Sequence, residues 1–245
     1  MAADVIRKQF HIKETHATVI AEECFMSLAE RTLSAARAEI ETYITGQPRF
    51  FTSLEPLLID MEAPGVVRRM AAAAALAEVG PMAAVAGAIA QVTVEALVAA
   101  GARHVIVDNG GDVVLRIDRP VRIGIFTGSA KIRDIALSVE PRPGIFSVCT
   151  SSGSVGHSLS FGRADAAMVV AASGSLADAM ATALGNRVRE ASEEAIDQAI
   201  RDTLADWVEG LLVVAGDRLG LGGKLPQIVR VPVNTRIIST SERPS

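Results

Sequence analysis

The sequence has few aromatic residues and no block of basic residues. Aromatics are 4% of the 245 residues, and 24 Lys and Arg against 28 Asp and Glu give a formal net charge of −4. Nucleic-acid binding draws on clustered basic side chains, and single strands also stack on aromatic rings. The composition therefore argues against a nucleic-acid partner. Hydrophobic residues are 49% of the chain, which is an ordinary share for a globular protein.

Cysteine is scarce, and the N-terminal segment lacks an apolar core. Cys24 and Cys149 are the two cysteines, so the sequence supports neither a disulfide framework nor a cysteine-based zinc site. Charged residues are spread through residues 1–16, which leaves no room for the apolar stretch of a signal peptide. We therefore expect a cytoplasmic protein.

Long uninterrupted apolar runs are missing as well. The most apolar region, residues 70–102, is broken by Glu78, by Pro81, by Gln91 and by Glu95. No stretch of about 18 apolar residues remains, so we expect no membrane span. Alanine and glycine supply most of the bulk of this region, and such small residues would let helices approach closely in a core.

The hydrophobic pattern predicts one α+β domain over residues 1–239, with helices packed on a largely antiparallel sheet and residues 240–245 as a frayed tail. Helices are expected over residues 25–45, 66–79, 82–100, 176–188 and 192–208. Strands are expected over residues 104–108, 113–117, 121–126, 135–139, 145–149 and 166–172, with a strand or a hairpin over 10–21. A closing hairpin is expected from residues 211–215 and 227–233, around a glycine-rich loop at 216–224.

The stretch Asn109-Gly110-Gly111-Asp112 lies between two predicted strands. Asn-Gly is a strong hairpin signal, because both residues tolerate positive φ. The two glycines would also let a ligand ring or a phosphate reach the backbone, with Asp112 at the rim. The sequence leaves both interpretations open.

A second stretch, Cys149 to Ser158, is rich in hydroxyl groups and glycine and follows a predicted strand. Such a loop can turn several N–H and O–H donors toward an anion. Ser154 sits in a near match to a nucleophile elbow, but that fold needs a histidine far along the chain, and His157 is three residues away. A hydrolase triad is therefore disfavoured, and Cys149 is expected to be a small buried residue at a strand end.

The helical stretch after Ser175 carries two oxygen-bearing side chains four residues apart, Asp178 and Thr182. Residues at this spacing share one helix face. Ser175 followed by Asp178 matches a capping box, which would make the carboxylate local helix chemistry. Mg²⁺ prefers one or two carboxylates with neutral oxygens and waters, so the pair could instead be half of a magnesium site.

Four segments in this order, Ala86–Gln91, Asn109–Asp112, Thr150–Gly153 and Ala177–Ala183, resemble the ApbE family of FAD:protein FMN transferases. The chain is still more similar to the uncharacterised cytoplasmic ApbE-like UPF group. The resemblance implies an ApbE-like fold and a flavin-sized cleft.

The resemblance also implies roles for individual residues. Asp178 and Thr182 would hold Mg²⁺ together with a backbone carbonyl near Ile89, and the ion would bridge the pyrophosphate of FAD. His157 is the candidate catalytic residue, in a segment that matches the family loosely. The candidate cofactor-binding residues are Asn109, Gly110, Gly111, Asp112, Thr150, Ser151, Ser152 and Gly153.

The chain departs from the transferases at Ala86–Gln91. The transferases usually carry a Lys-Gly-Tyr-Ala-Val-Asp run there, so the lysine, the tyrosine and the acid are missing. Two hypotheses follow: a magnesium-dependent enzyme that transfers FMN from FAD or hydrolyses the FAD pyrophosphate, or a non-catalytic binding protein for FAD, FMN or another large phosphorylated cofactor. A role in another cofactor pathway also stays open, and the sequence identifies neither an acceptor protein nor an oligomeric state.

Overall fold

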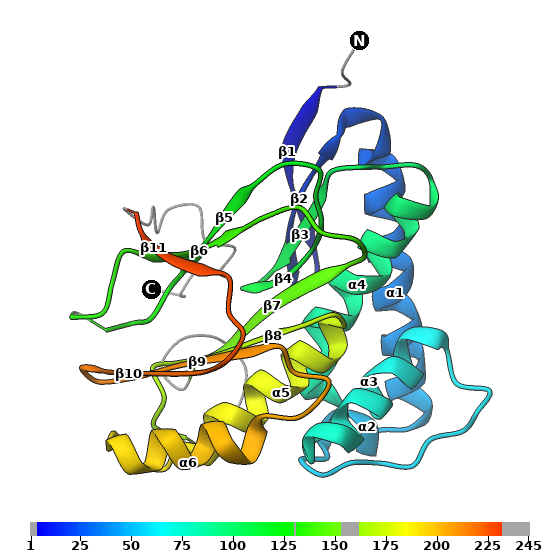
Figure 1. Ribbon diagram of the computed structural model, residues 1–245. Helices are drawn as coiled ribbons and strands as arrows, with labels where there is room; N and C mark the ends of the chain where they lie inside the picture. The colour runs from blue at the N-terminus through cyan, green and yellow to red at the C-terminus, as the bar shows by residue number, and fades with distance from the viewer. Residues whose placement is uncertain (1–3, 130, 153–161, 232–245) are drawn as a thin grey trace, which may run out of the picture.

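A large and a small antiparallel sheet organise the chain (Figure 1). The computed structural model describes residues 4–129, 131–152 and 162–231. The large sheet has the strand order β1-β2-β3-β4-β7-β8-β9-β10, and the small sheet has the order β11-β6-β5. Every strand pairing is antiparallel.

The elements have these bounds. The strands of the large sheet are β1 (Val5–Ile12), β2 (Thr15–Glu22), β3 (Val105–Asn109), β4 (Asp112–Arg116), β7 (Phe146–Ser151), β8 (Ala166–Ala171), β9 (Gly210–Ala215) and β10 (Arg218–Gly223). Those of the small sheet are β5 (Val121–Ile125), β6 (Ile135–Val139) and β11 (Gln227–Arg230). The helices are η1 (Glu23–Phe25), α1 (Met26–Gly46), α2 (Arg49–Thr52), α3 (Gly65–Ala77), η2 (Pro81–Ala84), α4 (Val85–Ala99), α5 (Gly174–Arg187) and α6 (Glu193–Thr203).

The large sheet has an apolar core on each face. Helices α1, α3, α4 and α5 gather on one face, where they form the larger core with side chains such as Leu33, Met70 and Leu184 (Figure 1). The small sheet lies on the other face and closes a second core, which includes Leu137 and Met168. Successive residues of a strand point to opposite faces, and here both faces are covered, so every residue of strands β8 and β9 is buried.

The α+β class and most of the predicted elements are confirmed. The closing hairpin is the exception. Strand β9 pairs with β10, which is the glycine-rich stretch itself, whereas β11 pairs with β6 in the small sheet. The glycines explain this: a Cβ at Gly220 would lie 2.2 Å from Cγ2 of Ile196, and one at Gly222 would lie 2.5 Å from Cγ2 of Ile200. Helix α6 therefore packs directly on β10.

Helix α4 belongs to the core of the domain. The stretch Pro81–Ala99 is long and apolar enough to cross a membrane by length and composition alone, but half of the apolar window is buried inside the protein. The helix packs on α1, α5, β3 and β4. Its apolar character is thus used for packing, and the tight approach expected from its small residues is found beside α5, as described next.

Candidate functional site

The predicted turn between β3 and β4 lies at the end of the large sheet. Asn109 pairs with Asp112, and Gly110 and Gly111 have φ values of 70° and 102°, so the hairpin interpretation is confirmed. The turn is also tied to its surroundings. Asp108 accepts a hydrogen bond from the Gly111 amide (3.0 Å), and the Asn109 side chain donates to the carbonyl of Ala86 (3.1 Å). The ligand-binding interpretation of the same residues remains a prediction.

Asp178 does not belong to a capping box. The N-cap of α5 is Ser173, whose hydroxyl accepts from the Leu176 amide, so the box predicted from Ser175 and Asp178 is wrong. Asp178 instead accepts a 2.8 Å hydrogen bond from the amide of Gly87, 91 residues away in the chain.

That amide belongs to the first turn of α4. The first amides of a helix have no intrahelical partner, and Ala84, the N-cap of α4, makes no side-chain cap hydrogen bond. A second hydrogen bond comes from the Ala86 amide. The Asp178 carboxylate therefore caps a neighbouring helix, and it also lies at the positive end of that helix dipole.

Two glycines allow this contact. A Cβ at Gly87 would lie 2.2 Å from the carbonyl oxygen of Gly174 and 2.7 Å from Cβ of Asp178. A Cβ at Gly174 would in turn lie 2.7 Å from the carbonyl oxygen of Gly87. Helices α4 and α5 therefore touch backbone to backbone at their N-terminal turns, which brings the Asp178 carboxylate to the amides of α4.

A second acidic group, Asp112, shares this environment. Asp112 is buried, and its carboxylate accepts a 3.3 Å hydrogen bond from the Thr150 amide. Burial and then the charge of Asp178 hold the pKa of Asp112 well above its usual range. Burial raises the pKa of Asp178 to about 7, although the amides of Gly87 and Ala86 act in the opposite direction. No Lys or Arg within the described ranges forms an ion pair with either carboxylate.

Cys149 completes the buried end of this site. Its thiol lies 3.6 Å from the carbonyl oxygen of Gly174, and burial followed by the charges of Asp112 and Asp178 raises its pKa well above the ordinary value. A thiol is nucleophilic as the thiolate, and this environment disfavours that form. Cys149 is thus the small buried residue that the sequence predicted.

The predicted metal pair lies on one face of α5. Asp178 is half-buried, and Thr182 is buried one turn further along. In the part of the chain that the structure describes, no three His, Cys, Asp or Glu side chains gather in a metal-binding arrangement. A magnesium site would then consist of Asp178, a hydroxyl or carbonyl oxygen, waters and ligand phosphates, which is a set that Mg²⁺ accepts. The contacts to Asp178 come from Ala86 and Gly87, whereas the Ile89 carbonyl accepts from Thr93 within α4.

The hydroxyl-rich stretch adjoins the turn through the contact between Thr150 and Asp112. Ser152 donates a 2.7 Å hydrogen bond to the carbonyl of Asp165. Ser151 is buried on the helix-covered face, and its hydroxyl has no hydrogen-bond partner within the described residues. The candidates Gly153 and His157 lie outside the described residues, so the prediction that both whole loops line one cleft stays a prediction.

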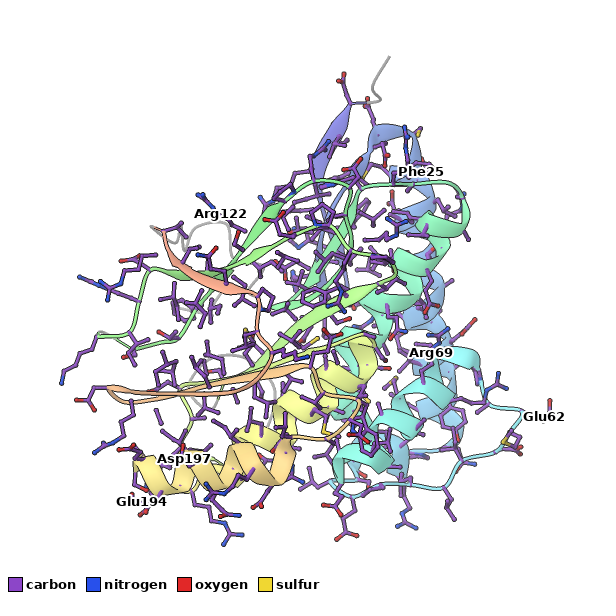
Figure 2. All side chains as sticks on the ribbon, in the orientation of Figure 1. Phe25, Glu62, Arg69, Arg122, Glu194 and Asp197 are labelled. Carbon is purple, nitrogen blue, oxygen red and sulfur yellow. The ribbon has the colours of Figure 1, made fainter. Side chains whose placement is uncertain are left out.

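A series of hydrogen-bonded polar side chains, which the sequence analysis did not predict, holds the first turn of α5 in place. Gln91 of α4 accepts hydrogen bonds from the Ser173 hydroxyl (3.0 Å) and the Ser175 amide (3.2 Å). The Gln91 side chain donates to Glu95 (3.0 Å), and Glu95 forms a two-bond ion pair with Arg69 of α3, which Figure 2 labels. The sequence feature that could have indicated this network is Gln91, an amide side chain in an apolar helix, because buried polar side chains normally have hydrogen-bond partners.

Two open hollows lie elsewhere on the molecule. One has a volume of about 570 Å³ and includes Tyr43 and Gly46 in its lining; the other, of about 350 Å³, includes Leu58 and Asp60. Neither touches Asp112 or Asp178. These two hollows are thus separate from the site at the sheet end, which is distinguished by its chemistry.

The sequence comparisons show the family. A family model described as AbpE bacteria matches residues 2–208. The chain belongs to this family. It is 45% identical to a UPF0280 protein of Methanocella arvoryzae over 240 residues, which cover 96% of this chain and 95% of that one. It is 44% identical to a UPF0280 protein of Archaeoglobus fulgidus over 226 residues, with coverage of 91% and 94%. The predicted membership of an uncharacterised ApbE-like UPF group is confirmed.

The fold of this AbpE family member is similar to solved ApbE structures. The flavin transferase ApbE from Vibrio cholerae superposes with a TM-score of 0.61 at 15% identity, over 90% of this chain and 97% of that one. An ApbE protein from Thermotoga maritima gives 0.55 at 13% identity, over 98% and 100%. At these identities the likeness establishes the ApbE fold, and the chemistry has to be argued from the site.

Proposed function

We propose that the protein binds Mg²⁺ through Asp178 and Thr182 and uses the ion to bind FAD or a similar dinucleotide at this end of the large sheet. The reaction would be transfer of FMN from FAD to an acceptor protein, or hydrolysis of the FAD pyrophosphate. The cytoplasmic location and the absence of nucleic-acid and membrane partners stay predictions.

The observation that carries the proposal is the pair of carboxylates, Asp112 and Asp178, with which no Lys or Arg of the described residues forms an ion pair. Burial disfavours the charged forms of both Asp112 and Asp178, and the charge of Asp178 adds to this effect at Asp112. No basic side chain in the described ranges forms an ion pair that would offset it. A divalent ion beside Asp178 would remove that cost. A carboxylate offers about four lone-pair sites, and the amides of Gly87 and Ala86 use two, so acceptor capacity for a metal remains.

The residues of the chain supply binding and orientation. Bound magnesium would neutralise charge on the pyrophosphate, as such ions do in phosphoryl chemistry. The buried Ser151 hydroxyl is the donor in the described part of the site whose partner is missing, which suits a ligand oxygen. The two-glycine turn at Gly110 and Gly111 leaves its backbone open, since a Cβ at Gly111 would meet nothing within 4 Å.

Isothermal titration calorimetry tests the proposal. Wild type, Asp178→Asn and Thr182→Val are titrated with FAD, in Mg²⁺ and in EDTA. We expect wild-type affinity to fall at least tenfold in EDTA, and both variants to bind in Mg²⁺ as weakly as wild type does in EDTA. Asp197→Asn, on the exposed surface of α6, is the matched control and should behave as wild type (Figure 2). Wild-type binding that EDTA leaves unchanged would overturn the metal assignment.

A second candidate function is binding without turnover. One observation favours it: Gln91 occupies the position of the acid in the family's run, and its oxygen is already committed to Ser173 and Ser175. Incubation with FAD and Mg²⁺ followed by chromatography separates the two candidates. FMN and AMP in solution, or FMN attached to an added acceptor, indicate an enzyme, whereas unchanged FAD with tight binding indicates a binding protein.

A further inference from the structure

Two histidines face each other across the first hairpin. His11 of β1 and His16 of β2 are direct partners in the antiparallel register. Their Nδ1 atoms lie 2.8 Å apart, and the rings meet edge to face, with centroids 5.0 Å apart and an interplanar angle of 75°. The two rings therefore bring the same nitrogen, Nδ1, within hydrogen-bond distance of each other.

This pair is separate from the Asp178 site. Ala17 is buried in the helix-covered core and pairs with Asn109 of β3. Because successive side chains of a strand point to opposite faces, His16 lies on the other face, and so does its partner His11. Asp112, which pairs with Asn109, is on the helix-covered face. His11 is exposed and His16 is half-buried, so solvent reaches the pair.

The nitrogen separation indicates a coordination geometry. With metal–nitrogen bonds of about 2.0–2.1 Å, two ligands at 90° have nitrogens about 2.9 Å apart, whereas two tetrahedral ligands have them about 3.3 Å apart. The observed 2.8 Å matches the right-angle arrangement. Square-planar and tetragonal nitrogen sites are typical of Cu²⁺ and Ni²⁺.

We propose that His11 and His16 form a two-histidine site for a divalent transition ion of the Cu²⁺ and Ni²⁺ class. Both rings ligate through Nδ1 and carry their proton on Nε2. Water fills the remaining positions, since no third His, Cys, Asp or Glu ligand joins the pair within the described residues. The ion replaces the hydrogen bond that now joins the two rings. Mg²⁺, which prefers oxygen ligands, does not bind here.

Nickel titration of the untagged full chain tests the site. Calorimetry with Ni²⁺ in a non-coordinating buffer is run on wild type, His11→Phe and His16→Phe. Phenylalanine keeps an aromatic ring in the hairpin but has no ring nitrogen, so a purely structural ring contact survives. Gln9→Ala, on the same face of β1, is the control that leaves both histidines in place. We expect wild type and Gln9→Ala to bind one equivalent, reversibly with EDTA, and each phenylalanine variant to lose at least 90% of that binding.

Copper gives an independent readout. The electron paramagnetic resonance spectrum of bound Cu²⁺ should show coupling to two imidazole nitrogens in wild type, and that signature should disappear in either phenylalanine variant. Wild type that takes up no Ni²⁺, or phenylalanine variants that bind as wild type does, would overturn the proposal. The pair would then be only a cross-strand contact that stabilises the hairpin. Either result leaves the FAD titration unaffected, because the two sites lie on opposite faces of the sheet.

Discussion

Replacing Asp178 with asparagine should stabilise the protein when no divalent metal is present. The pKa of Asp178 rises from an ordinary value of 3.8 to about 7 in the folded protein. A tenfold change in a protonation equilibrium corresponds to roughly 1.4 kcal/mol, so keeping the carboxylate ionised in the fold costs up to about 4 kcal/mol at pH 8. Asparagine carries no charge, and its carbonyl oxygen can still accept from the Gly87 amide.

A competing effect has the opposite sign. The ionised carboxylate interacts favourably with the N-terminal end of α4, and losing that interaction costs roughly 0.3–1 kcal/mol. A weaker cap on the first turn costs about another 1 kcal/mol. The net cost of ionisation in the fold, which already includes the opposing effect of the Gly87 and Ala86 amides, is larger than these two together. We therefore expect Asp178→Asn to raise the free energy of unfolding by at least about 2 kcal/mol at pH 8.

The pH dependence of this effect follows from the same raised pKa. Between about pH 4 and pH 7 the Asp178 carboxyl is ionised in the unfolded chain but protonated in the folded one, so its contribution to the stability of wild type falls as pH rises. The advantage of Asp178→Asn should therefore grow across this window and be absent near pH 4. Urea unfolding in EDTA at pH 4, 6 and 8 measures it, with Asp197→Asn as the control. A variant less stable than wild type at pH 8, or a difference that does not change with pH, would refute the reasoning.

Two further predictions concern packing and an ion pair. Gly87→Ala should lower the free energy of unfolding by about 3 kcal/mol, because the new methyl group would lie 2.2 Å from the carbonyl oxygen of Gly174. Urea unfolding at pH 7 measures this loss, and a near-neutral effect would contradict the close approach of α4 and α5. Glu209→Gln should cost less than about 1 kcal/mol at pH 7, since its ion pair with Arg142 is about one-third exposed and screened. The hydrogen bond from Arg142 lowers the pKa of Glu209 in the folded protein. The stability that the ion pair contributes is therefore present above pH 4.5 and lost as pH falls through the folded pKa. A stability loss in Glu209→Gln that persists at pH 2 would argue against this ion pair.

Local pattern was sufficient to predict most of the fold. The two-glycine turn follows from Asn109 and its neighbours, and the helix boundaries follow from glycine, proline and the apolar period. The error at the closing hairpin has a tertiary cause. Glycines of β10 look like a loop in the sequence, but Ile196 and Ile200 of α6 occupy the space that their side chains would fill.

In the candidate site, too, the sequence shows local spacing but not the contacts made by tertiary packing. The four-residue spacing of Asp178 and Thr182 is visible in the sequence, and it was compatible with a capping box as well as with a metal. The contact that decides against the box joins Asp178 to Gly87 across 91 residues, and no local rule reports such a partner. Gln91 was visible as an isolated polar residue, but its partners Ser173 and Glu95 required the packing of α3, α4 and α5.

The close approach of Gly87 and Gly174 determines when the site becomes ordered. With the backbones of α4 and α5 in contact, Asp178 can reach the amides of α4 without any rearrangement of the helices. The conformational entropy of aligning this carboxylate is therefore lost during folding, and a ligand that uses it does not lose it again on binding. Affinity at this site should depend on the stability of a helix contact that the ligand itself never touches.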